Sequence, residues 1–129
     1  MSEKKKILIV DDDKDYGEAL KIVLSRKGYH VNHVLNVQDG RRSVEEEEPA
    51  LIILDVMMDR HTDGFDFCRN LKNDNIYKHI PVIMVTAVTG KTGFKFSPET
   101  DGEYLQADDY ISKPVPSSEL LLRVEKLIG

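Results

Sequence analysis

An uninterrupted apolar segment that stops at a carboxylate, residues 51–55, constrains the fold of this chain most strongly. A short continuous apolar run is typical of a strand buried on both faces, as the strands of parallel sheets are. An ionised carboxylate inside such a strand would be unfavourable. Asp55 is therefore expected at the carboxyl end of the strand, and ligands bind at that edge in open α/β sheets.

The rest of the chain alternates between strand patterns and helix patterns. Four further strands are predicted at residues 7–10, 29–34, 81–85 and 110–111. Helices are predicted from residue 15 to Gly28, from residue 37 to about residue 47, along Phe65, Cys68 and Leu71, and after Ser117. This alternation predicts an α/β fold, a doubly wound five-stranded parallel sheet with helices on both faces.

Two of these helices have clear end signals, and one segment resists assignment. Asn36 is predicted to cap the helix that Pro49 ends, and Ser117 to cap the last helix. Asp63-Gly64 precedes the helix that carries Cys68. The segment 88–108 carries several residues that are unfavourable inside a helix, namely Gly90, Gly93, Pro98 and Gly102. It is expected to be a long irregular loop with at most a short helix.

Length and composition limit the classes of function. A chain of 129 residues, 40% of them hydrophobic, is expected to form a single domain over residues 1–129. A net charge of -5 argues against direct binding of nucleic acid. A single cysteine, Cys68, excludes an intrachain disulfide and is expected in the core. No apolar run is long enough to span a membrane, and the N-terminus leaves no room for a signal peptide, so a cytoplasmic location is expected.

The predicted strands end in residues that suit phosphate chemistry. Asp11, Asp12, Asp55, Thr86 and Lys113 all follow carboxyl ends of strands and are expected at one edge of the sheet. Three neighbouring carboxylates repel one another and favour a cation such as Mg²⁺. A lysine and a threonine can bind phosphoryl oxygens, and a carboxylate can act as the nucleophile. Each residue alone has an ordinary structural explanation, so the prediction depends on their joint placement.

With these motifs in order, the whole chain resembles the receiver domain of two-component response regulators. The motifs are Ile7 to Asp13, Leu54-Asp55, Val85-Thr86-Ala87 and Tyr110 to Pro114. The resemblance implies the flavodoxin-like strand order 2-1-3-4-5. It also implies a phosphoryl acceptor, a protein that catalyses only its own phosphorylation and dephosphorylation. The implied partners are a sensor histidine kinase or a phosphotransfer protein, and a downstream protein target.

The resemblance assigns a role to each matching residue. Asp55 would take the phosphoryl group from a phosphohistidine. Mg²⁺ would be bound by Asp12, Asp55 and the backbone carbonyl of Met57, with Asp11 acting through water. The phosphoryl oxygens would be bound by Lys113, Thr86 and the backbone N–H of Ala87, and Thr86 with Tyr110 would form the switch that reshapes a partner-binding face.

The sequence departs from the family pattern at two places. Asp59 stands where the family usually has proline, and is expected to face water rather than the cation. The stretch from Thr86 to Lys113 is longer than usual, which puts the family's usual output surface in question, and Phe94 and Phe96 within it are expected to fold back as core. Apart from these departures, the resemblance places Met57 and Val88 beside the site, and because both are apolar it implies a fairly long-lived acyl phosphate.

Three other interpretations are compatible with parts of the sequence. Gly90-Lys91-Thr92 is close to a phosphate-binding loop, but Val85 replaces its first glycine. Asp11-x-Asp13 is similar to the motif of haloacid-dehalogenase phosphatases, although Lys14 does not fit that pattern. The third is a receiver-like binding module that phosphate does not regulate.

Overall fold

Five parallel strands form the sheet of this protein. The computed structural model describes residues 4–55, 61–86, 107–112 and 116–128, with the side chains at 61–65, 86 and 112 excepted. The strands are β1 (Lys6–Val10), β2 (His30–Val34), β3 (Leu51–Asp55), β4 (Val82–Thr86) and β5 (Asp109–Ser112). They lie in the order β2-β1-β3-β4-β5, and every neighbouring pair is parallel. The predicted fold class and strand order are confirmed.

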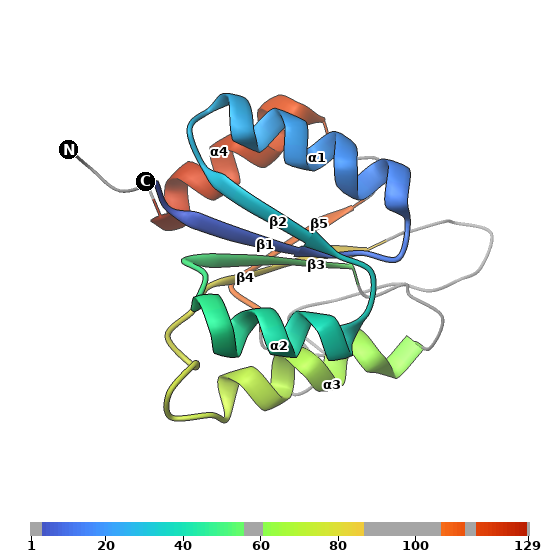
Figure 1. The fold of residues 1–129 in the computed structure, drawn as a ribbon, viewed down its shortest axis with the longest axis vertical. Coiled ribbons are helices and arrows are strands. Elements are labelled where there is room, and N and C mark those ends of the chain that lie inside the picture. Colours follow the sequence, from blue (N-terminus) through green and yellow to red (C-terminus); the bar gives the residue numbers. More distant parts are fainter. Residues whose placement is uncertain (1–3, 56–60, 87–106, 113–115, 129) are drawn as a thin grey trace.

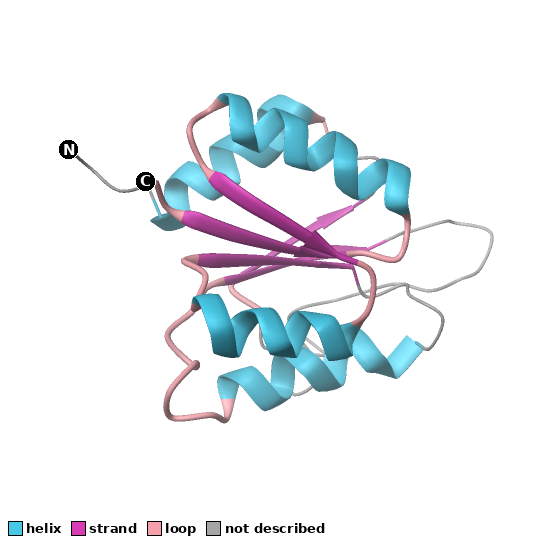
Figure 2. Cartoon of the chain, viewed as in Figure 1, coloured by secondary structure: helices cyan, strands magenta, loops and turns pink. Residues whose placement is uncertain are grey.

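Helices cover both faces of the sheet. The helices α1 (Lys14–Arg26) and α4 (Ser117–Ile128) pack on one face, and α2 (Val37–Glu47) and α3 (His61–Lys72) pack on the other (Figures 1 and 2). Within the described ranges, no helix has the length and apolar character needed to cross a membrane. The segment predicted to be irregular, 88–108, lies almost wholly outside the described residues, so that expectation stays a prediction.

Side-chain caps and backbone turns set the helix ends. The side chain of Asn36 accepts a hydrogen bond from the backbone N–H of Asp39 (2.8 Å), and α2 runs over the predicted residues. Asp13 caps α1 in the same way by accepting from the N–H of Tyr16 (3.0 Å). Beyond α1, Gly28 has a φ of 97°, a left-handed conformation that glycine adopts without a steric penalty.

Two helix starts differ from the prediction. The sequence places Asp63-Gly64 before the helix that carries Cys68, whereas α3 begins at His61 and includes both residues. One glycine lowers helix stability by only about 1 kcal/mol, and the buried residues of the later turns offset this. The helix α4 begins at Ser117 itself, and the N–H of Leu120 donates to the carbonyl of Pro116 (3.1 Å). Ser117 therefore lies in the first turn rather than before it.

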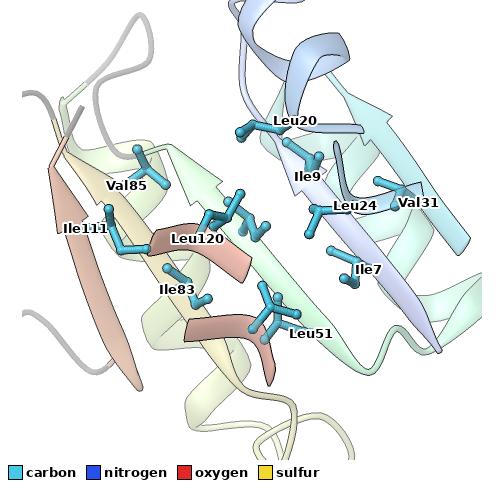
Figure 3. Packing of buried hydrophobic residues seen from close by; sticks show 12 residues of the cluster. Ile7, Ile9, Leu20, Leu24, Val31, Leu51, Ile83, Val85, Ile111 and Leu120 are labelled. Atoms are coloured by element: carbon cyan, nitrogen blue, oxygen red, sulfur yellow. The ribbon is translucent and has the colours of Figure 1, made fainter. Parts of the chain in front are cut away.

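The core has two halves, one on each face of the sheet. Alternate residues of β1 point to opposite faces, so Ile7 and Ile9 pack with α1 and α4, whereas Leu8 and Val10 pack with α2 and α3. Figure 3 shows the first half, in which Leu24 and Leu120 approach the sheet from the two helices. The central strands β1 and β3 are buried on both faces. This burial explains their continuous apolar sequence.

The single cysteine lies in the second half of the core. Cys68 is fully buried on α3, beside Phe67 and Leu71. Burial raises the pKa of its thiol to about 11, which the nearby Lys72 partly counters. Because the thiolate is the reactive form, this side chain is unsuited to redox or nucleophilic chemistry at neutral pH. The prediction that Cys68 is a core residue is confirmed.

A lysine joins α3 to the amino ends of two strands. The Lys72 ammonium donates to the carbonyl of Ile80 (2.8 Å) and to the Asp108 carboxylate (2.7 Å). The same carboxylate oxygen accepts from the backbone N–H of Val82 (2.8 Å). Lys72 is largely buried, with a side-chain exposure of 14%. This cluster fixes the edge of the sheet opposite to Asp55.

Replacing Lys72 tests how much this cluster contributes to stability. Lys72→Met keeps the aliphatic stem but leaves the Ile80 carbonyl and the Asp108 carboxylate without their shared donor. We expect a loss of about 1–2 kcal/mol in the free energy of unfolding, reduced from the buried value because Asp108 is partly exposed. Urea denaturation measures the change, and Lys78→Met, at an exposed position in the loop after α3, is the control. An equal effect of the two substitutions would contradict this role.

Candidate functional site

The register of the sheet brings the predicted site residues to one edge. Val10 pairs with Leu54, so Asp11 after β1 lies level with Asp55 at the end of β3. Asp55 in turn pairs with Val85, next to Thr86. The carboxyl ends of β1, β3 and β4 therefore meet at the same height. This is the edge at which parallel sheets bind ligands.

Three carboxylates gather at this edge. One carboxylate oxygen from each of Asp11, Asp12 and Asp55 lies within 4.8 Å of the other two. Asp11 and Asp55 are buried, with exposures of 2% and 3%, whereas Asp12 is exposed. Like charges at this separation repel one another unless a cation or protons neutralise them. The predicted convergence of the three acids is confirmed.

The donor set fits Mg²⁺. All three ligand atoms are hard carboxylate oxygens, which Mg²⁺ prefers. Oxygens around one Mg²⁺ lie about 3–4 Å apart when each is about 2.1 Å from the ion, so the observed spacing needs only a small contraction. The exposure of Asp12 leaves one side open to the waters that Mg²⁺ usually keeps. Asp11, Asp12 and Asp55 are thus suited to hold this cation.

Local hydrogen bonds hold the loop that carries two of these acids. The N–H of Asp11 donates to the Val34 carbonyl of β2 (3.1 Å). The N–H of Asp13 donates to Oδ1 of Asp11 (2.8 Å), while the Asp13 side chain caps α1. The side chain of Asp13 is therefore engaged as the N-cap of α1. Its neighbours Asp11 and Asp12 are the ones that face Asp55.

A histidine that was not among the sequence candidates also contacts this loop. The ring of His33, in β2, places Nε2 2.9 Å from the carbonyl oxygen of Asp11 and Nδ1 3.0 Å from a Glu18 carboxylate oxygen. The His33 hydrogen bond is the main cause that lowers the pKa of the exposed Glu18 carboxyl. The His33 side chain is almost fully buried, at 3% exposure. The alternation of β2 places His33 on the same face as the buried Val31, but this local pattern does not indicate the contact with Asp11.

Several predicted site residues lie outside the described part of the chain. Thr86 is placed by its backbone at the end of β4, paired with Ser112 of β5. The side chain of Thr86 is not among those described, and neither are the other predicted ligands and neighbours, namely Met57, Asp59, Ala87, Val88 and Lys113. The same holds for Gly90-Lys91-Thr92, Phe94 and Phe96. Their roles stay predictions.

The predicted switch residue Tyr110 lies on β5 beside the core. Its ring is half-buried and packs against the half of the core under α2 and α3. Burial is the main cause that raises the pKa of its phenol, and the carboxylates of Asp108 and Asp109 add to it. Tyr110 therefore carries its proton at neutral pH and can act as a hydrogen-bond donor.

Comparisons with known proteins agree on one family. The family model described as the response regulator receiver domain matches residues 7–125. The transcriptional regulatory protein GltR of Pseudomonas aeruginosa is 39% identical over 122 residues, which cover 95% of this chain and 48% of GltR. The chain spans about half the length of the curated relatives it matches.

Solved structures give the same result. The signal receiver domain of a signal transduction histidine kinase from Syntrophus aciditrophicus is 35% identical, with a TM-score of 0.80, covering 96% of this chain and 89% of that one. A response regulator signal receiver domain from Bermanella marisrubri is 28% identical, with a TM-score of 0.81, covering 98% and 100%. In both, the similarity extends over nearly the whole of the two chains.

Proposed function

Since this chain belongs to the response regulator receiver domain family, we propose that Asp55 accepts a phosphoryl group from a phosphohistidine. The donor would be a sensor histidine kinase or a phosphotransfer protein. The observation that carries the proposal is the convergence of the Asp11, Asp12 and Asp55 carboxylates within 4.8 Å at the carboxyl edge of the sheet. Carboxylates that only cap helices or face solvent do not require one another's proximity. Phosphoryl transfer, in contrast, requires both a nucleophile and charge neutralisation at one place.

Asp55 is the residue of the three best placed to be the acceptor. It ends the central strand β3, paired with β1 on one side and β4 on the other, so its backbone is held firmly. A carboxylate oxygen of Asp55 would form the new O–P bond while the P–N bond of the phosphohistidine breaks. The leaving imidazole keeps the electron pair of that bond and takes up a proton.

The neighbouring residues would position the reactants. Asp12, Asp55 and the Met57 carbonyl would hold Mg²⁺, with Asp11 acting through water, and the bound cation supplies charge neutralisation at the phosphoryl oxygens. Lys113, Thr86 and the Ala87 N–H would bind these oxygens from the β4 and β5 side. Positioning and electrostatic stabilisation account for most of the rate enhancement in phosphoryl transfer.

The phosphorylated protein would act as a signal and not as a metabolic intermediate. In this proposal the protein catalyses only its own phosphorylation and its own dephosphorylation, in which water attacks the phosphorus. Thr86 and Tyr110 would report the phosphoryl group to a face that binds a downstream protein in the cytoplasm. The net charge of -5 argues that this chain does not itself contact nucleic acid.

Phosphorylation by a small donor tests the proposal without a cognate kinase. After incubation with Mg²⁺ and acetyl phosphate, we expect intact-mass spectrometry to show one added phosphoryl group per chain. Hydroxylamine should remove it, since an acyl phosphate is cleaved by this nucleophile and a phosphoserine is not. Chelation of Mg²⁺ by EDTA should prevent labelling. A protein that binds Mg²⁺ but stays unlabelled would support the alternative of a binding module that phosphate does not regulate.

A further inference from the structure

A buried histidine connects the acidic loop to two other elements. His33 lies in β2, on the face of the sheet that α1 covers, and its Nε2 atom is 2.9 Å from the carbonyl oxygen of Asp11. A carbonyl oxygen can only accept, so Nε2 is the donor in the bond to Asp11. Its Nδ1 atom is 3.0 Å from the Glu18 carboxylate of α1. The ring therefore bridges β2, α1 and the start of the Asp11-Asp12 loop.

The absence of a side chain at Gly17 creates the space for this ring. A Cβ atom built at Gly17 would lie 2.2 Å from both Cε1 and Nε2 of His33, closer than any real contact. Gly17 lies inside α1, where glycine is less favourable than alanine by about 1 kcal/mol. Its position against the imidazole gives a physical reason for this unfavourable choice. The pair Gly17 and His33 thus fits together as one unit.

We propose that His33 is a positioning residue, which fixes the backbone of Asp11 so that the Asp11 and Asp12 carboxylates are preorganised for the cation. This inference rests on the proposed function for the identity of the ligand. It adds a residue whose side chain touches neither the cation nor the phosphoryl group.

The hydrogen bonds around Asp11 explain how this positioning works. β2 holds both backbone groups of Asp11, because Val34 accepts its N–H and His33 donates to its C=O. With the peptide plane after Asp11 fixed, the Asp13 N–H is directed to Oδ1 of Asp11 (2.8 Å). Without the His33 donor, the buried carbonyl loses a partner and this peptide plane can rotate. Binding of a cation then has to order the Asp11-Asp12 loop, which lowers the affinity for the cation.

Two substitutions at His33 separate hydrogen bonding from packing. His33→Leu fills a similar volume but removes the donor. We expect it to weaken Mg²⁺ binding about tenfold, the lower end of the range for residues that orient metal ligands. His33→Gln places an amide N–H at a similar reach, and we expect its Mg²⁺ affinity within about threefold of wild type. Calorimetric titration of the full chain with Mg²⁺ measures both.

A spectroscopic measurement on the metal-free protein tests the geometry itself. In ¹H–¹⁵N spectra, the His33 Nε2 resonance should have the shift of a protonated nitrogen. The Asp13 amide resonance should move in His33→Leu and return towards its wild-type position in His33→Gln. His30→Leu, at an exposed position on the same strand, should leave both the Asp13 resonance and Mg²⁺ affinity unchanged.

Phosphorylation kinetics provide a second, independent distinction. In His33→Leu the Mg²⁺ concentration for half-maximal labelling by acetyl phosphate should rise about tenfold, in line with the affinity. The labelling rate at saturating Mg²⁺ should stay within about threefold of wild type, because Asp55 itself is unchanged. Glu18→Gln keeps the bond to Asp11 and should behave like wild type.

The outcomes distinguish this inference from the proposed function. Wild-type protein that binds no Mg²⁺ would overturn both. Wild-type binding together with equal affinity in His33→Leu would overturn only the role of His33. Equal losses in His33→Leu and His33→Gln would overturn it as well, since they would indicate packing alone. If His33→Leu does not fold, His33→Phe keeps an aromatic ring without the donor, and its Asp13 resonance and Mg²⁺ affinity, compared with those of His33→Gln, decide the question.

Discussion

Asp55→Asn is expected to fold normally and to carry no phosphoryl group after incubation with Mg²⁺ and acetyl phosphate. Asparagine has nearly the same volume as aspartate, so the burial of this position at the end of β3 is preserved. Its amide is not a nucleophile toward phosphorus. Removing a nucleophile lowers the rate by at least about 1,000-fold in comparable systems, and labelling should fall below detection. Intact-mass spectrometry after a fixed incubation provides the measurement.

Two neighbouring acids supply matched controls for this experiment. Asp13→Asn should be labelled like wild type, because asparagine caps a helix about as well as aspartate does and Asp13 caps α1. Asp12→Asn keeps the acceptor and loses a cation ligand, so its labelling should need more Mg²⁺. Urea denaturation should show Asp55→Asn to be no less stable than wild type without metal, because one of three like charges is gone.

The position of the label decides between two chemistries. Peptide mapping of the wild-type product should place the phosphoryl group on Asp55. A label on Asp11, still present in Asp55→Asn, would contradict the proposal and support the phosphatase-like interpretation of the Asp11-x-Asp13 motif. The role of Asp13 as a helix cap already favours the first result, since that residue is engaged with the N–H of Tyr16.

Elements with sharp local signals were predictable from the sequence. The helix α2 has the predicted bounds because Asn36 caps it and Pro49 follows it, and both effects act within a few residues. The strand β3 was predictable because four apolar residues end at Asp55. The start of α3 was not, because the apolar pattern that predicts this helix begins only at Phe65, after Gly64. The turns that follow bury Phe67, Cys68 and Leu71, which holds the helix despite that glycine.

The same distinction applies to the site. Asp11, Asp12 and Asp55 could be brought together from the sequence, because parallel strands put all their carboxyl ends at one edge. His33 could not, because its contact with Asp11 joins residues 22 apart and depends on the missing side chain of Gly17. The pair of Lys72 and Asp108 is separated by 36 residues and escaped prediction for the same reason. Pairs of this kind follow from packing, which no local pattern encodes.

Among the substitutions proposed for this protein, Ile53→Ala is expected to cause the largest decrease in the free energy of unfolding. Ile53 is 1% exposed, lies in the central strand β3, and is flanked in register by Ile9 and Ile83. Truncating it removes buried apolar surface and leaves a cavity between rigid strands, at a loss of about 3–4 kcal/mol. This is a large part of the 5–15 kcal/mol that is typical of a small domain. Urea denaturation without metal measures the change.

Two comparisons show whether Ile53→Ala affects only the core or also the cation site. One uses a substitution at an exposed isoleucine, and the other measures the stability with added Mg²⁺. Ile22→Ala, at a position 54% exposed on α1, should change stability by no more than about 0.5 kcal/mol. A ligand that binds the folded state alone stabilises it by an amount set by its affinity, so Mg²⁺ should raise the stability of both variants equally if the site is intact. A smaller increment in Ile53→Ala would mean that the cavity also displaces Asp55, two residues further along the same strand. A loss below about 1 kcal/mol would contradict the rigid central strand on which the positioning of Asp55 depends.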